Sequence, residues 1–205
     1  MTPRSLAEAA RAAATLMLTA ALLLGGDARA ADAAAVTHYV LDPAKSSLEF
    51  TFLQAGAQNK GRFTRFQVAF DFAAANLAAG RLDVTVDINS VDTGDQERDE
   101  TLRGADLFAV VKFLQAHFVA SQINRTASGY EAVGKLTIRG VTHDARVPFA
   151  FRTTSENGAT VGYMTGKTSV RRLDYGVGQG DWKATDQVGN DVGVSFALRL
   201  TAAAR

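Results

Sequence analysis

The chain has 205 residues and a formal net charge of +1, from 22 basic and 21 acidic side chains. A chain of this length suits one domain with a full hydrophobic core. The balanced charge lacks the basic footprint of a nucleic-acid-binding protein, and the absence of cysteine excludes disulfides, thiol chemistry and a lipid-attachment cysteine.

The first 30 residues have the pattern of a cleaved signal peptide. Arg4 and Arg11 give a positive start, an apolar run covers residues 12–24, and Ala28-Arg29-Ala30 fits the small-x-small cleavage site. The apolar run is shorter than the ~20 residues that a spanning helix needs. We therefore predict export to the periplasm. The mature protein, residues 31–205, is expected to be soluble, not membrane-spanning, and to form a single domain with 19 basic and 19 acidic side chains.

Most of the mature chain alternates apolar and polar residues with the period of a half-buried β-strand. A change of parity near Phe63 predicts a bulge or bend, and Asn157-Gly158 is a strong hairpin turn. Pro148 lacks an amide donor, so it suits a sheet edge or a bulge. Strands are predicted over residues 48–52, 66–72, 82–88, 113–121, 130–138, 147–151, 160–170 and 192–200.

Residues 95–103 depart from this alternation and are predicted to form a short helix. Thr93 and Gln96 have the spacing of a capping box, in which each side chain bonds a free backbone N–H of the first turn. Gly104 follows the last helical residue and is expected to end the helix with a positive φ.

The predicted helix is polar, so it is expected to lie over other elements and not within the core. Asp99 and Arg103 have the spacing of a helical ion pair. Leu102 is its only sizeable apolar side chain, and we expect Leu102 and Phe108 to be the anchoring contacts.

The predicted strands number about eight, and each has one consistently apolar face. This pattern predicts an all-β fold, either an antiparallel barrel or a sandwich. Closure into a barrel removes exposed strand edges, which favours that arrangement, although alternation alone is the same in both folds.

No arrangement of residues predicts catalysis. His38, His117 and His143 lack metal-ligand spacing, and the chain has neither a Gly-x-Ser-x-Gly elbow nor a cysteine nucleophile. The glycines of residues 176–180 have neither the spacing nor the βαβ context of a dinucleotide site. We therefore predict no enzyme activity, no catalytic residue, no metal and no cofactor.

Four blocks of sequence carry a family signature. They are Ser90-Val91-Asp92-Thr93-Gly94, the pairs Arg98-Asp99 and Leu102-Arg103, residues 134–142 (Gly-Lys-Leu-Thr-Ile-Arg-Gly-Val-Thr), and residues 171–178 (Arg-Arg-Leu-Asp-Tyr-Gly-Val-Gly). Together they resemble the YceI-like family of periplasmic polyisoprenoid-binding proteins. The resemblance implies a lipocalin-like antiparallel β-barrel with one short helix near its end, whose lumen holds an isoprenoid lipid or an isoprenoid quinone.

An isoprenoid tail needs an apolar tunnel, and the 12 phenylalanines of the chain are able to line one. Each buried CH₂ contributes ~0.8 kcal/mol, so tail burial is expected to dominate affinity while head-group contacts set orientation. The candidate lumen residues are Phe50, Phe52, Phe66, Phe70, Phe72, Ala132, Gly134, Phe149, Phe151 and Phe196. The candidate mouth residues are Arg98, Asp99, Leu102, Arg103, Phe108 and Trp182.

Three segments depart from the usual family pattern. Gln54-Ala55-Gly56 replaces histidine-leucine-glycine, Phe113-Leu114 replaces an aromatic-proline pair, and Leu107-Phe108 replaces paired aromatics. The first two resemble family members that accompany membrane cytochromes of the b561 type. Such a cytochrome is therefore a candidate partner, and the oligomeric state is left open, with a dimer among the alternatives.

Two other functions fit the same pattern. One is an interaction module with a filled core, which serves a membrane electron-transfer or stress-response partner through the helix and the Trp182 loop. The other is a lipid hydrolase or isomerase, which requires a polar cluster inside the barrel. A filled core gives the same alternation of phenylalanines as an open lumen, because small barrels are often filled by side chains.

Overall fold

The structure is a computed structural model, and it describes residues 35–203. The predicted signal peptide, residues 1–30, lies outside this range. The strands are β1 (Thr37–Leu41), β2 (Ser47–Gln54), β3 (Ala57–Phe63), β4 (Phe66–Phe72), β5 (Arg81–Asp87), β6 (Val91–Asp92), β7 (Gln115–Thr126), β8 (Gly129–Ile138), β9 (Val141–Glu156), β10 (Ala159–Arg171) and β11 (Asp191–Ala202). The helix α1 (Gln96–Arg103) follows β6, and short 3-10 helices are formed by Pro43–Lys45, Leu77–Ala79, Ile88–Ser90, Arg172–Tyr175 and Gly180–Lys183. In this part of the chain, no helix has the length and apolar character required to cross a bilayer.

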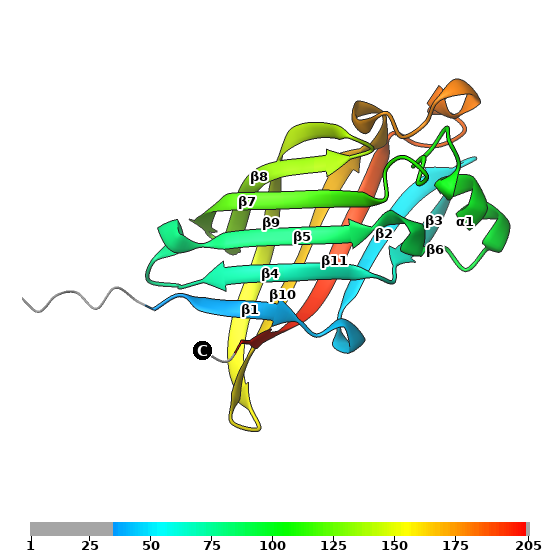
Figure 1. Cartoon of the computed structure of the whole chain (residues 1–205). Helices are drawn as coiled ribbons and strands as arrows, with labels where there is room; N and C mark the ends of the chain where they lie inside the picture. The colour runs from blue at the N-terminus through cyan, green and yellow to red at the C-terminus, as the bar shows by residue number, and fades with distance from the viewer. Residues whose placement is uncertain (1–34, 204–205) are drawn as a thin grey trace, which may run out of the picture. The chain divides into compact units, whose positions relative to one another are not determined.

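Eight of the strands form a closed antiparallel barrel. Their order is β1-β4-β5-β7-β8-β9-β10-β11, and β1 pairs with the last part of β11 to close the ring (Figure 1). The first part of β11 pairs with β2 instead, and the sheet continues from β2 through β3 to β6. The predicted barrel with one short helix is confirmed, and closure leaves the ring without free edges.

Local backbone chemistry explains several strand boundaries. Asn157 and Gly158 both have positive φ, as a tight β9–β10 hairpin requires. β8 pairs with β9 from Tyr130 to Ile138, but the β9–β10 ladder ends at the pair Phe149 and Gly166. The next residue of β9 is Pro148, whose ring nitrogen has no hydrogen to donate. The proline is thus inside a strand at the point where pairing on one side stops.

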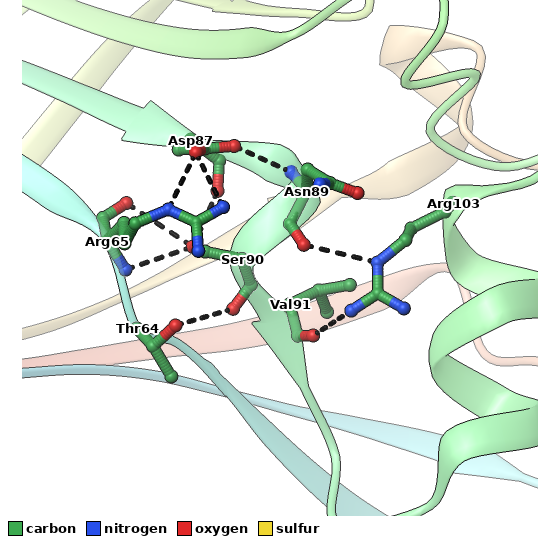
Figure 2. Close-up of polar contacts among 7 residues, drawn as sticks. All are labelled: Thr64, Arg65, Asp87, Asn89, Ser90, Val91 and Arg103. Carbon is green, nitrogen blue, oxygen red and sulfur yellow. Dashed lines mark hydrogen bonds and ion pairs between the residues drawn. The ribbon is translucent and has the colours of Figure 1, made fainter.

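A hydrogen-bonded network joins the predicted bend between β3 and β4 to the connection after β5 (Figure 2). The Ser90 hydroxyl donates to the Asp87 carbonyl (2.6 Å) and accepts from the Arg65 amide (3.0 Å). The Thr64 amide donates to the Ser90 carbonyl, and the Arg65 guanidinium pairs with Asp87 at 2.9 Å. These bonds hold the two connections together beside α1.

The helix α1 is held by side chains that point toward the strands. Arg103 donates to the carbonyl oxygens of Asn89 (3.1 Å) and Val91 (2.7 Å), as Figure 2 shows. Asp99 is buried and accepts from the amide (2.8 Å) and hydroxyl (2.7 Å) of Thr93. The predicted Asp99–Arg103 ion pair is therefore wrong, because each side chain has a tertiary partner.

The ends of α1 also differ from the prediction, although the helix itself is confirmed. The N-cap is Asp95, whose carboxylate accepts from the Arg98 amide at 3.0 Å, so the capping box of Thr93 and Gln96 is wrong. Gly104 has φ of −60° and needs no glycine-specific conformation. Asp95 provides the preferred carboxylate cap at the positive end of the helix dipole.

An aromatic core fills one half of the barrel. Phe70 is fully buried and contacts Phe149 and Phe151 edge-on, with ring centroids 5.8 and 5.1 Å apart. Phe72 stacks on Phe70 at 5.1 Å, and Tyr39 packs edge-on against Phe151 at 5.3 Å. Phe70 and Phe72 lie at the end of β4, which points away from α1 in Figure 1. The filled half is therefore the half remote from α1.

Candidate ligand-binding cavity

The half of the barrel beside α1 contains a cavity of about 610 Å³. This volume lies within the range of ~300–1,000 Å³ typical of small-molecule sites. The side chains that line it are mostly apolar and come from both sides of the barrel, from α1 and from the β10–β11 connection. Five of them also belong to the aromatic core and form the floor of the cavity: Val68, Leu82, Phe118, Met164 and Leu198.

Two phenylalanines of the cavity wall lie over glycines of the neighbouring strand. Phe50 pairs with Gly61, and Phe196 pairs with Gly166. A Cβ atom at Gly61 would lie 2.8 Å from Phe50 Cε1, and one at Gly166 would lie 2.9 Å from Phe196 Cε1. Each glycine therefore leaves room for a ring against the wall, and the centre of the cavity stays open.

The candidate lumen residues separate into two groups. Phe50, Phe52, Phe66 and Phe196 line the cavity, and their contact with a ligand stays a prediction. The other six do not line it, namely Phe70, Phe72, Ala132, Gly134, Phe149 and Phe151. Five of these six are core side chains of the filled half or pack against them. Gly134 lies against the backbone of β7 at a bulge, where a Cβ atom would come 2.6 Å from Ala120 Cα.

The candidate mouth residues also divide by role. Arg98, Leu102, Phe108 and Trp182 line the cavity, whereas Asp99 and Arg103 hold α1 in place and do not line it. The expected anchoring role of Leu102 and Phe108 is confirmed, because both pack against the apolar clusters beneath α1.

The α1 side of the mouth carries charge of both signs. Asp95 and Glu97 line the cavity there, and the Arg98 guanidinium lies 3.6 Å from the Asp95 carboxylate. Within residues 35–203, no group of three histidine, cysteine or acidic side chains is placed to bind a metal ion.

A buried arginine that the sequence reasoning did not select lines the opposite wall. Arg172 is 5% exposed and donates to the carbonyls of Gly189 (2.9 Å), Val177 (2.9 Å) and Val188 (2.7 Å). Burial lowers the pKa of its guanidinium, but an arginine keeps its charge in proteins. Arg172 thus clamps the β10–β11 connection and places a positive charge at the cavity.

Tyr175 is the second residue of this wall that was not among the candidates predicted from the sequence. Its side chain is 6% exposed, and its ring meets His143 edge-on with centroids 5.0 Å apart. Burial and the nearby Asp174 carboxylate raise the pKa of the Tyr175 hydroxyl, which therefore stays protonated at neutral pH. Arg172 and Tyr175 both lie within the sequence block at residues 171–178. That block signalled the family, but nothing in it showed which side chains face the cavity.

Comparisons with known protein sequences agree with the family signature. The YceI-like domain family matches residues 39–200. A UPF0312 protein of Yersinia enterocolitica is 43% identical over 82 residues, which are 40% of this chain and 43% of that protein. A UPF0312 protein of Yersinia pestis is 42% identical over the same length. The match therefore spans less than half the length of these curated relatives.

Three solved structures share the fold. Burkholderia cenocepacia BcnA is 33% identical with a TM-score of 0.71, and the alignment covers 78% of this chain and 98% of BcnA. A YceI protein of Campylobacter jejuni is 23% identical with a TM-score of 0.65, covering 72% of this chain and 87% of that one. A polyisoprenoid binding domain from Saccharophagus degradans, implicated in plant cell wall breakdown, is 19% identical with a TM-score of 0.58, covering 80% and 98%.

Proposed function

Because the chain belongs to the YceI-like domain family, we propose that it is a binding protein that holds an isoprenoid lipid or an isoprenoid quinone in its barrel. The observation that carries this proposal is the apolar cavity of about 610 Å³ beside α1. The Saccharophagus degradans domain, which has the same fold, is described as polyisoprenoid binding. Binding and carriage, not catalysis, are the function proposed.

The chemistry of the cavity supports a long apolar ligand. The floor at Met164 and Phe118 consists of hydrocarbon, sulfur and aromatic groups and offers no charged partner. Two isoprene units contain about ten carbons, so their burial at ~0.8 kcal/mol per CH₂ contributes several kcal/mol before the cost of binding. We infer that the tail points to the floor and the head group to the mouth.

We further propose that the protein works in the periplasm and exchanges its ligand with a membrane partner. The signal-peptide pattern of residues 1–30 supports the location. The departures at residues 54–56 and 113–114 support a cytochrome of the b561 type as that partner. The filled-core interaction module is the less favoured alternative, because the filled core occupies the half of the barrel remote from α1 and the other half is hollow.

Native mass spectrometry of the exported protein, followed by organic extraction, tests the binding function. We expect a stoichiometric isoprenoid or quinone mass. Replacing Val194, which lines the cavity on β11, by tryptophan should narrow the space and reduce the bound mass. The matched control is Val119→Trp, at a 42% exposed position on β7 that does not line the cavity.

Two outcomes would contradict the proposal. One is a protein that is empty as purified and stays empty after incubation with several isoprenoid quinones. The other is a Val194→Trp variant that folds and carries as much lipid as the Val119→Trp control.

A further inference from the structure

One wall of the cavity offers hydrogen-bond donors. It is formed by Arg172, Tyr175 and Trp182, which all belong to the connection between β10 and β11 and all line the cavity. Tyr175 and Trp182 pack in the same apolar cluster. Arg172 Nη1 and the Trp182 carbonyl both lie against Gly178, so the three side chains come from one compact segment. We call these three residues the donor wall.

The Arg172 guanidinium has N–H groups that form no hydrogen bond within the described part of the fold, and its positive charge has no acidic partner there. A guanidinium carries five N–H groups, and three hydrogen bonds to carbonyls are formed. No carboxylate within residues 35–203 lies at ion-pair distance from it. A buried positive charge without an acidic partner is costly, and an electron-rich group placed beside it lowers that cost.

Tyr175 and Trp182 add donors that the fold itself does not use. Among residues 35–203, neither the Tyr175 hydroxyl nor the indole N–H of Trp182 forms a hydrogen bond, and the Tyr175 residue as a whole is 6% exposed. Neither atom is among the buried side-chain atoms left without a partner in this range, so each reaches accessible space, where a hydroxyl or an indole N–H is free to donate. Here the accessible space next to both side chains is the cavity.

We propose that the donor wall binds a head group that presents hydrogen-bond acceptor oxygens, as a quinone carbonyl or an isoprenyl phosphate does. This inference rests on the proposed function and gives the ligand an orientation, with its tail toward Met164 and its head on Arg172, Tyr175 and Trp182. On the α1 side of the mouth the charge is mixed, because Asp95 and Glu97 line the cavity beside Arg98, whereas the three side chains of the donor wall present donors and one positive charge.

The substitution Tyr175→Phe tests this assignment. It removes a hydroxyl that has no hydrogen-bond partner in the described part of the chain, so the melting temperature should not fall. The probes are a ubiquinone with two isoprene units, geranylgeranyl phosphate and squalene, which has no head group. We expect affinity for both head-bearing probes to fall about three- to tenfold, the effect of one lost hydrogen bond, and affinity for squalene to stay unchanged.

The matched control is Tyr130→Phe, which removes the hydroxyl of a tyrosine that packs against the filled core and does not line the cavity. A second variant, Trp182→Phe, removes the indole N–H and keeps an aromatic ring, and it should weaken the same two probes. The relative affinity of the wild type for the quinone and the phosphate shows which source of acceptor oxygen the wall prefers.

The two proposals fail in different ways. If Tyr175→Phe and Trp182→Phe bind all three probes as the wild type does, the donor wall is not the head-group site, but a tail-binding cavity stands. If the wild type binds none of the probes, including squalene, the proposed lipid-binding function itself is wrong.

Discussion

Gly61 controls how far the Phe50 ring reaches into the cavity, and the substitution Gly61→Ala tests this role. The two residues are cross-strand partners on the inner face of β3 and β2. A Cβ atom at Gly61 would lie 2.8 Å from Phe50 Cε1 and 2.9 Å from Thr93 Cγ2. Carbon atoms pack at ~3.5–4.0 Å, so the ring must retreat by roughly 0.7 Å or more, and the open direction is the cavity.

The structure predicts a small effect on stability and a larger one on binding. Overpacking lowers the free energy of unfolding by about 1–3 kcal/mol, whereas replacing a glycine within a strand by alanine raises it by about 0.5–1 kcal/mol. The net fall in the free energy of unfolding should therefore be only about 1 kcal/mol. If the Phe50 ring displaces two CH₂ groups of the tail, about 1.6 kcal/mol of burial is lost, which weakens lipid affinity roughly 15-fold.

Urea unfolding measures the first quantity, and titration with a short-chain isoprenoid quinone measures the second. The control is Gly193→Ala on β11, where the new Cβ would meet the Thr51 hydroxyl and no ring. Gly193 does not line the cavity, so its variant should bind lipid as the wild type does. Unchanged affinity in a folded Gly61→Ala protein would refute the reasoning that this glycine keeps the lumen open.

Two further predictions concern polar contacts outside the cavity. Asp99→Ala removes both hydrogen bonds to Thr93 and should lower the free energy of unfolding by about 2–4 kcal/mol in urea titrations; an unchanged midpoint would show that α1 is held in another way. Hydrogen bonds from Tyr163 and Arg199 hold the pKa of Glu156 below its usual value. The ionised Glu156 carboxylate therefore stabilises the fold at any pH above that usual value. The stabilisation is lost as pH falls through the lowered pKa of Glu156. The melting temperature of the wild type should therefore drop more steeply below about pH 4.5 than that of Glu156→Gln. Parallel curves of melting temperature against pH for the two proteins would contradict this role of Glu156.

The sequence predicted the barrel and the helix because both depend on local patterns. Alternation with a period of two recurs in most strands, and the charged segment before Arg103 interrupts it. The roles of Asp99 and Arg103 were not predictable in this way. Each has a helical neighbour at the right spacing, but Asp99 accepts from the Thr93 amide and Arg103 donates to the Val91 carbonyl, both outside the helix. Such a part-buried tertiary bond outweighs an exposed ion pair.

The donor wall escaped the sequence analysis for a related reason. Arg172, Tyr175 and Trp182 lie in a long connection with two 3-10 turns and no regular period, so no pattern shows which side chains face inward. The clamp of Arg172 on Gly189 and Val188 joins residues about 16 positions apart and forms only in the folded chain.

The alternation of apolar and polar residues is also the same in a filled barrel and in a hollow one, and this barrel has one filled half and one hollow half. Phe66 and Phe70 share one face of β4, but Phe66 lines the cavity while Phe70 is fully buried in the core. Four residues of strand span about 13 Å, enough to pass from one half to the other. The filled and the hollow half differ in which strand pairs with β11. Where β1 pairs with β11 and closes the ring, Tyr39 packs on Phe70 and Phe151. Where β2 pairs with β11 instead, the sheet continues outward to β6 and the interior stays open. The depth of the lumen is therefore set by the point along β11 where its neighbour changes, which is a long-range property that residues 66–72 do not encode by themselves.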